Sequence, residues 1–587
     1  MFVAALLAVI TGSLLSGIMW IMVVAGIAGS FEKSVSVGDN TILTIHLAED
    51  INDTPVTDPL RQIDFASMNV RRSLSLYNVL TAIDAARNDD RIKGIMIRPT
   101  GGGNVSLSTL EELRAALVDF KQSGKFIVAY NEYYTQGSYY LATVADKIYL
   151  QPQGSFAWQG MNFTLSFYKG LFDKLGLEAE IFRPTACKYK SAVEPYFLTR
   201  MSEANRRQMS ELAESMWGTI ISTVAEARGI SIERLNRMAD NLSVALPEDA
   251  LEYGLVDGLL YEDQMNDVFE ELGVEKQTNG EYNYVSLGDY CSQTVPENAF
   301  ARDKIAIVYA EGDIVEGEGG DGSIGTGLAQ TLKEVRHDDN VKAVVVRVNS
   351  PGGSALTSDV IWREMNLLKE SKIVIVSMGG YAASGGYYIS APADAIVADR
   401  MTLTGSIGVF GLSIYTGKFF SDKLGVTFDN VASNTYADMG NTTRKITPAE
   451  RAVMMRGVDK VYDTFTSLVA EGRNLPLDDV LEIAGGRVWS GAEALDTGLA
   501  DANGGLKYAI ALAADKAGLD NYGITELVDQ PDGFMALLSS LNTRIKSRRT
   551  AAADPALAAV MREYAAVKRI TERQGILTYC PYVIEIQ

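Results

Sequence analysis

The chain has 587 residues, of which 47% are hydrophobic and 22% are charged, so it can bury large cores and should contain more than one domain. Its formal net charge of −21 argues against a nucleic-acid partner, because phosphate binding needs clustered Lys and Arg side chains. Cys187, Cys291 and Cys580 are too few and too scattered for a disulfide framework or a cysteine metal site. We expect no metal and no cofactor.

The chain begins with an apolar run, residues 1–30, that contains no charged side chain. A membrane-spanning helix needs roughly 20 apolar residues, and this run is longer than that. A cleaved signal is the alternative, since residues 25–28 offer small side chains for a peptidase, but no basic residue precedes the apolar part. We therefore predict an uncleaved transmembrane anchor over residues 1–30.

The rest of the chain contains two copies of one unit. RIKGIMIRPTGGG matches NVKAVVVRVNSPGGS, GKFIVAYN matches SKIVIVSM, and GSYYLATVADKIYL matches GGYYISAPADAIVA. The matched segments lie 247 to 249 residues apart. A near-constant offset over so long a stretch indicates an internal duplication.

Each copy alternates β-branched runs with longer helical patterns, as in KAVVVRVN, SDVIWREMNLLKES and KIVIVSM. Such alternation predicts βαβ units and a parallel sheet. The predicted fold class is therefore α/β, with two tandem domains at residues 38–272 and 304–524. Residues 273–303 are polar and are interpreted as a linker, and residues 525–587 form a tail without a counterpart in the first copy.

Positions where the copies differ in reactive residue type indicate where chemistry is retained. Aligning YYTQGSYYLA with YAASGGYYIS places Gln136 opposite Ser384. Aligning CKYKSAVEP with SNTYADMGN through their tyrosines places Lys190 opposite Ala437. One candidate nucleophile and one candidate base therefore occur in different halves of the chain.

A serine nucleophile needs a base, and His46 and His337 are the two histidines of the sequence. His46 lies in an apolar run and His337 precedes the second strand of its unit, so both are interpreted as structural residues. A lysine can serve as the base only when its amine is neutral, which requires burial or a cationic neighbour. We predict a Ser384–Lys190 dyad at the interface between the two halves.

Acyl transfer also needs hydrogen-bond donors for the developing oxyanion. Gly352 and Gly353 follow a predicted strand in the segment SPGGS, and Gly385 follows the candidate nucleophile. Glycines permit a close approach of the backbone to a substrate. The amides of these three glycines are the predicted oxyanion donors.

Together these segments resemble the signal peptide peptidase A (protease IV) family in its long, duplicated form. The matching motifs are NSPGGSALTSDVIW, GGYAASGGYYIS and LTGSIGVFG in the second copy and YKSAVEP in the first. The resemblance implies a Clp protease/crotonase-like fold repeated twice and a dyad of Ser384 and Lys190. It also implies a homotetramer anchored in the bacterial cytoplasmic membrane, with the catalytic domains on the outer, periplasmic side, that degrades remnant signal peptides.

Two other functions stay open. The crotonase fold also hosts acyl-CoA hydratases and thioesterases, in which paired glycine amides hold a thioester enolate. Such enzymes need no serine beside a lysine. The third possibility is a non-catalytic membrane scaffold in which the repeat forms an oligomerisation ring. For a peptidase, the expected substrates are extended hydrophobic peptides that add as a strand beside the active site.

Overall fold

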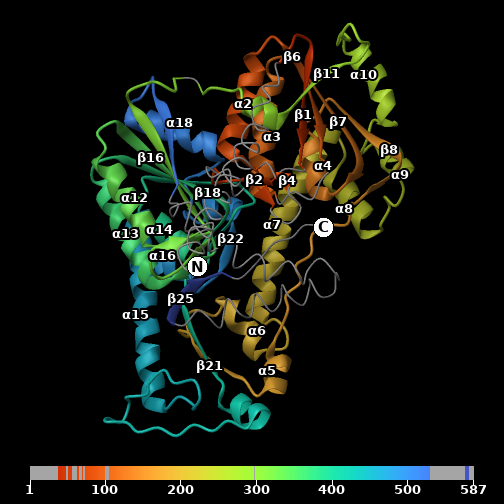
Figure 1. Cartoon of the computed structure of the whole chain (residues 1–587). Helices are drawn as coiled ribbons and strands as arrows, with labels where there is room; N and C mark the ends of the chain where they lie inside the picture. Colours follow the sequence, from red (N-terminus) through yellow and green to blue (C-terminus); the bar gives the residue numbers. More distant parts are fainter. Residues whose placement is uncertain are drawn as a thin grey trace, which may run out of the picture.

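The computed structural model describes residues 37–47, 50–55, 63–64, 69–70, 73–99, 105–296, 298–320, 322–528 and 575–580. Figure 1 shows two upper lobes, one coloured red to yellow and one green to blue, above a lower arm that contains β21, α5 and α6. The predicted anchor at residues 1–30 lies outside the described residues. Within the described ranges, no helix is both long and apolar enough to cross a membrane.

The first lobe is built on a six-stranded sheet in which every pair of neighbouring strands is parallel. In spatial order its strands are β10 (Gly258–Leu259), β8 (Lys147–Phe156), β7 (Phe126–Tyr134), β6 (Ile92–Arg98), β1 (Thr41–His46) and β11 (Asn283–Ser286). The central strand β6 is buried along most of its length, as expected for a parallel strand between two helical layers.

The second lobe repeats this arrangement. Its main strand path is β22 (Val488–Ser490), β20 (Leu403–Gly405), β18 (Ile373–Ala383), β16 (Val341–Ser350), β12 (Lys304–Glu311) and β24 (Gly523–Leu527). Off this path, β19 (Ala395–Ala398) pairs with β18, and β23 (Ala502–Asn503) pairs with β19. The neighbours are parallel except for β20 and β22. The predicted α/β class with two parallel-sheet domains is therefore confirmed.

Helices connect and cover the strands of both sheets. The first half contains α2 (Leu76–Asn88), α3 (Leu107–Lys121), α4 (Gln136–Ala142), α5 (Lys169–Leu175), α6 (Glu194–Phe197), α7 (Glu203–Arg228), α8 (Ile232–Asp240), α9 (Pro247–Glu252), α10 (Met265–Glu271) and α11 (Leu287–Cys291). The second half contains α12 (Thr326–His337), α13 (Ala355–Lys369), α14 (Gly385–Ser390), α15 (Pro448–Arg473), α16 (Leu477–Ile483), α17 (Gly491–Asp496) and α18 (Leu506–Ala517). Serine N-caps fix several of the starts, for example Ser106 at α3 and Ser354 at α13, because the hydroxyl accepts a first-turn amide.

The stretch interpreted as a linker, residues 273–303, contains two regular elements. Strand β11 pairs in parallel with β1 at the edge of the first sheet, and α11 follows it directly. In the second half, β24 takes the same place beside β12. Each copy therefore ends with a strand that returns to pair with its own first strand, and β11 is too short to give a clear periodic signal in the sequence.

A third sheet joins the two halves. Its strand order is β14 (Gly319–Gly320), β15 (Ser323–Ile324), β13 (Asp313–Ile314), β17 (Gly352–Ser354), β25 (Gly575–Tyr579), β21 (Phe410–Tyr415) and β9 (Glu178–Phe182). Strand β9 belongs to the first copy and pairs antiparallel with β21 of the second copy. Strand β25 belongs to the C-terminal tail and lies between β17 and β21.

Trp158 is the largest fully buried side chain of the first lobe. Its indole Nε1 donates a 3.0 Å hydrogen bond to the Leu235 carbonyl oxygen, and its ring packs against Tyr139 and Trp217. We expect Trp158→Ala to lower the free energy of unfolding by about 3–5 kcal/mol, because a large cavity would replace the ring. Urea unfolding followed by circular dichroism measures this loss, and a change below about 1 kcal/mol would contradict the packing described here.

Candidate active site

Ser384 occupies the junction between β18 and α14. Its backbone has φ 57° and ψ −113°, a conformation that non-glycine residues rarely adopt. The Ser384 amide donates a 2.8 Å hydrogen bond to the Gly405 carbonyl oxygen of β20, which helps to hold this turn. The residue is completely buried. A strained serine held at a strand-to-helix turn points to a functional role for its hydroxyl.

Lys190 lies in a loop that the first half extends toward the second, just before a short 3-10 turn at Ser191–Val193. Helix α7 anchors the loop: Gln208 Nε2 donates to the Tyr189 carbonyl oxygen at 3.1 Å and to Ser191 Oγ at 2.7 Å. Buried Glu194 accepts hydrogen bonds from Ser202 and from other groups at the start of α7. These contacts give the lysine a fixed backbone position.

Two glycines of the second half receive the Lys190 loop. The Tyr189 amide donates a 3.0 Å hydrogen bond to the Gly485 carbonyl oxygen. A Cβ on Gly486 would lie 2.5 Å from Lys190 Cβ, and the φ of Gly486 is +82°. Only glycine satisfies both conditions without displacing the loop. The close approach of the two halves at this point brings Lys190 to the end of β18.

The structure brings Lys190 and Ser384 together. Lys190 Nζ lies 2.6 Å from Ser384 Oγ, 2.8 Å from the Ser406 carbonyl oxygen and 2.9 Å from Ser406 Oγ. Burial lowers the pKa of Lys190 to about 7, and the nearby Cys580 and Cys187 thiols oppose this shift. A neutral amine has two N–H groups and one lone pair. If both N–H groups are donated to Ser406, the lone pair points toward the hydroxyl proton of Ser384.

Ser406 is the residue of this site that the sequence analysis missed. It is buried, has φ 51°, and its amide donates to the Arg487 carbonyl oxygen at 2.7 Å. It lies 248 residues after Trp158, so the first copy has an indole where the second has a hydroxyl. The comparison of copies that singled out Ser384 would also have found Ser406, had it been extended to the segment LTGSIGVFG.

Two of the predicted oxyanion glycines, Gly352 and Gly353, lie on β17, which contacts α14. Gly385 is the first residue of α14, directly after Ser384. The Gly352 amide donates to Ser350 Oγ at 3.1 Å, and Gly353 lies opposite Thr578 in the pairing of β17 with β25. Helix α14 also lies close to the end of β16, since a Cβ on Gly386 would lie 2.6 Å from the Ser350 carbonyl oxygen. The donor role of the three glycines stays a prediction.

The C-terminal strand β25 also lies next to β17, and it ends near the Lys190 side chain. It pairs antiparallel with β17 on one side and with β21 on the other. Leu577 packs into an apolar cluster formed by Phe172, Ala192, Val193, Tyr196, Phe410 and Leu412. The Cys580 amide donates a 2.7 Å hydrogen bond to the Pro351 carbonyl oxygen, and the Cys580 side chain is buried near Lys190.

The corresponding position of the first copy holds no nucleophile. Gln136 begins α4, as Ser384 precedes α14, and its side chain is buried. Gln136 Oε1 accepts hydrogen bonds from the amides of Gln159 and Gly160 at 2.9 and 2.7 Å. Ala437, the counterpart of Lys190, lies on an exposed loop of the lower arm. The first copy therefore has a structural amide where the second has Ser384, and the second copy has an alanine where the first has Lys190.

The two histidines lie on other elements. His46 ends β1, and partial burial lowers its pKa. His337 ends α12, where its Nδ1 lies 2.7 Å from the Lys333 carbonyl oxygen and the side chain is exposed. Lys190 is the basic group that the structure places within hydrogen-bond distance of Ser384.

Comparison with known proteins finds the same two repeated regions. Peptidase family S49 matches residues 119–275 and 366–520, one region in each copy, and the Clp protease family matches residues 297–406. Protease 4 of Salmonella typhi is 34% identical over 496 residues, which cover 83% of this chain and 79% of that protein.

Two further relatives show the same similarity. The chloroplastic serine protease SPPA of Arabidopsis thaliana is 34% identical and covers 76% of this chain and 66% of its own length. A protein of Enterococcus faecium that carries the name signal peptide peptidase SppA is 34% identical over 46% of this chain and 73% of its own length. The resemblance inferred from the motifs is thereby confirmed: the chain belongs to peptidase family S49, the protease IV family of serine peptidases, and carries its Clp protease-like unit twice.

Proposed function

We propose that the protein is a membrane-anchored endopeptidase in which Ser384 is the nucleophile and Lys190 the general base, and that it degrades cleaved signal peptides. The observation that carries the dyad is the 2.6 Å distance between Lys190 Nζ and Ser384 Oγ in a site buried from water. A lysine whose pKa is lowered to about 7 is partly neutral at physiological pH and can accept a proton.

The geometry supports a two-stage acyl transfer. Lys190 Nζ takes the Ser384 hydroxyl proton while Oγ attacks the scissile carbonyl carbon, and backbone amides stabilise the negative oxygen. The ammonium then returns its proton to the leaving amine as the peptide C–N bond breaks. In the second stage, Lys190 takes a proton from water, which attacks the ester carbon. Collapse of this intermediate releases the acid and gives Ser384 Oγ its proton back.

We expect Ser384→Ala and Lys190→Ala each to lower kcat by about 10³-fold or more, and the double variant to be no slower than either single one. Exposed Ala437→Ser is the matched control and should retain normal turnover. A serine-reactive phosphonate should label the wild type and not Ser384→Ala. Additive losses in the double variant would show that the two residues do not act as one unit.

The strand pairing beside the dyad supports extended peptides as substrates. Strand β25 pairs with β17 on one side and with β21 on the other, so an extended chain segment fits between these two strands. The apolar cluster around Leu577 offers a contact for a bulky aliphatic side chain. Signal peptides contain long apolar segments. The name of the Enterococcus faecium relative also supports this substrate class.

Residues 575–580 occupy the place where such a substrate would pair. Ending the chain at residue 574 should therefore raise kcat/KM for a short hydrophobic peptide several-fold, because the substrate no longer competes with β25. Steady-state kinetics on the full chain and the truncated chain measure this. Reduced activity with intact folding would instead mean that β25 completes the binding groove.

We propose that residues 1–30 anchor the protein in the bacterial cytoplasmic membrane, with the catalytic lobes on the periplasmic side. The uncharged apolar length of this run supports the anchor. Lateral access from the bilayer would suit apolar peptides, which partition into lipid after their release from preproteins.

Each copy contributes equivalent segments to the lower arm, but only some of them belong to a sheet of the described structure. The segments that lie outside the sheets support assembly into a homotetramer. In the first copy, β9 of the lower arm crosses to pair with β21 of the second copy. The second copy contains the equivalent of β9 at residues 427–431, and the segment LSFY at 165–168 matches LSIY of β21. Neither stretch belongs to a sheet of the described structure. Residues 427–431 of one molecule could pair with residues 165–168 of the next, which continues the same contact around a ring.

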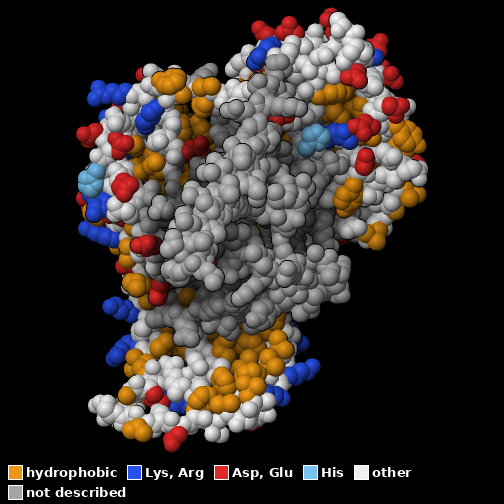
Figure 2. Space-filling model, in the orientation of Figure 1, with side chains coloured by type: hydrophobic (Ala, Val, Ile, Leu, Met, Phe, Trp, Pro, Cys, Tyr) orange, Lys and Arg blue, Asp and Glu red, His pale blue; other side chains and the backbone are white. Residues whose placement is uncertain are grey.

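The lower arm also exposes apolar side chains. Figure 2 shows hydrophobic atoms gathered on this arm. The exposed apolar residues of its outer loop are Leu424, Val426, Phe428, Val431, Tyr436 and Met439. A patch of this kind on an otherwise charged protein is typical of an interaction surface.

We expect Phe428→Asp to shift the detergent-solubilised protein from tetramer to smaller species, because a carboxylate would enter the apolar contact between arms. Light scattering after size-exclusion chromatography measures the mass. Tyr508→Asp, at an exposed aromatic residue of α18, is the control and should leave the assembly intact. An unchanged mass for Phe428→Asp would contradict the arm-to-arm contact.

A further inference from the structure

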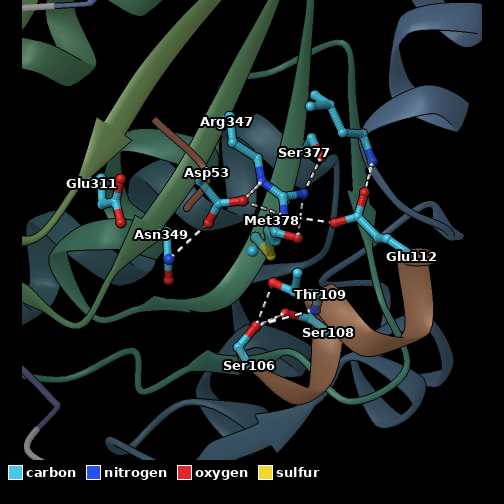
Figure 3. Close-up of polar contacts among 12 residues, drawn as sticks. Asp53, Ser106, Ser108, Thr109, Glu112, Glu311, Arg347, Asn349, Ser377 and Met378 are labelled. Carbon is cyan, nitrogen blue, oxygen red and sulfur yellow. Dashed lines mark hydrogen bonds and ion pairs between the residues drawn. The ribbon is translucent and has the colours of Figure 1, made fainter. Parts of the chain in front are cut away.

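A buried ion cluster crosses the boundary between the two halves (Figure 3). Arg347 lies on β16 of the second half, and its side chain is completely buried. Its guanidinium is 2.7 Å from the Asp53 carboxylate and 2.6 Å from the Glu112 carboxylate, both of which belong to the first half. Arg347 Nη1 also donates to Ser377 Oγ of β18 at 2.9 Å. The arginine therefore ties the nucleophile-bearing strand to the first half.

The equivalent arginine of the first copy has a different environment. Arg98 lies 249 residues before Arg347 and pairs with Glu262 of its own half. The Glu262 side chain is 61% exposed. The buried pairing across the boundary is thus a feature of Arg347 and not of the repeat as such.

The cluster contains more carboxyl groups than cations. Buried Asp399 contacts the Glu112 carboxyl, and its Oδ2 has no hydrogen-bond donor among the described residues. Glu311 accepts the Thr54 amide at 3.3 Å on the other side of Asp53. Arg347 is thus ion-paired with two of these four carboxyl groups, Asp53 and Glu112. An unpaired buried carboxylate is very costly, so two carboxyls in contact must share a proton.

The groups around Asp399 agree with this protonation. Burial raises the pKa of Asp399 well above its usual range, and the negative charges of Glu112 and Glu111 raise it further, while Arg347 lowers it. Glu111 is itself paired with Arg400, the next residue along the chain. Burial also raises the pKa of Glu112, which Arg347 opposes.

We propose that a proton shared between Asp399 and Glu112 holds the two halves in the relative position that the dyad requires. Asp399 thus acts as a positioning residue. Its deprotonation in alkaline solution weakens the contact between the two halves. The inference rests on the proposed chemistry of Ser384 and Lys190. Loss of the proton would place two carboxylates in contact. The repulsion would act on α3, whose Glu112 also accepts the Leu506 amide at 2.5 Å.

The two ionisations have opposite consequences for turnover. Lys190 must lose its proton to act as the base, so activity rises with pH through about 7. The Asp399–Glu112 pair must keep its proton. Because the folded state binds that proton more tightly than the unfolded state, the stabilisation is complete below about pH 4 and is lost as pH rises toward the folded-state value. We therefore expect a bell-shaped profile whose alkaline limb belongs to the carboxyl pair.

The test is the pH profile of kcat/KM for the full-length, detergent-solubilised wild type and for Asp399→Asn. The amide of Asn can donate to Glu112 as the shared proton does, but it cannot ionise. We expect the rising limb to stay in place and the alkaline limb to move up by at least one pH unit, with several-fold higher activity at the alkaline end. Asp515→Asn, at an exposed position of α18, is the control and should follow the wild type.

An alkaline limb at the same pH in Asp399→Asn, or no alkaline limb in the wild type, would overturn the proposal. A merely structural role would lower activity equally at every pH. The thermal midpoint in a Ser384→Ala background separates this inference from the proposed catalysis, since Asp399→Asn should remove the alkaline loss of stability there as well. If Asp399→Asn fails to fold, hydrogen-exchange protection of the wild-type Leu506 amide must fall over the same pH range, and constant protection would overturn the proposal.

Discussion

The proposed chemistry of this protein depends on keeping one amine, that of Lys190, away from water. Lys190 is fully buried, and the neighbours that act on its charge are the thiols of Cys580 and Cys187 rather than a carboxylate. Burial without an anionic partner disfavours the ammonium form, which is why the pKa of Lys190 falls to about 7. Neither half alone can provide such a site, because the loop of the first half must be covered by residues of the second. In the proposed mechanism, the boundary between the halves is therefore part of the catalytic apparatus.

Several residues at the boundary between the halves have unusual or restricted backbone conformations. Ser384 and Ser406 both have positive φ values, and Gly486 leaves room for the Lys190 backbone. Strained residues of this kind persist when the surrounding structure determines them, and here two sheets and a loop do so. The Arg347 cluster also holds this boundary, because Arg347 contacts both Ser377 of β18 and Glu112 of α3. Backbone geometry and buried charge thus fix the same relation between the halves.

The repeated fold and the candidate dyad could be predicted from the sequence. A constant offset revealed the duplication, β-branched runs predicted the parallel sheets, and the differences between copies led to Ser384 and Lys190. Ser406 was within reach of the same comparison. In contrast, β11 and β25 are short strands that pair with partners far away in the chain, and no local periodicity marks them. The cross-half pairing of Arg347 was equally hidden, because Arg98 in the first copy is an ordinary partly exposed ion pair.

The two copies have diverged in complementary ways, and the structure gives each change a physical reason. In the first copy, the Gln136 amide binds the backbone at Gly160, and Trp158 fills the position of Ser406. The first copy therefore has no hydroxyl for a lysine to activate, and a buried lysine there would bring only its desolvation cost. The second copy has Ala437 where the first copy has Lys190. In the proposed reaction, the single pair of Ser384 and Lys190 therefore serves both copies.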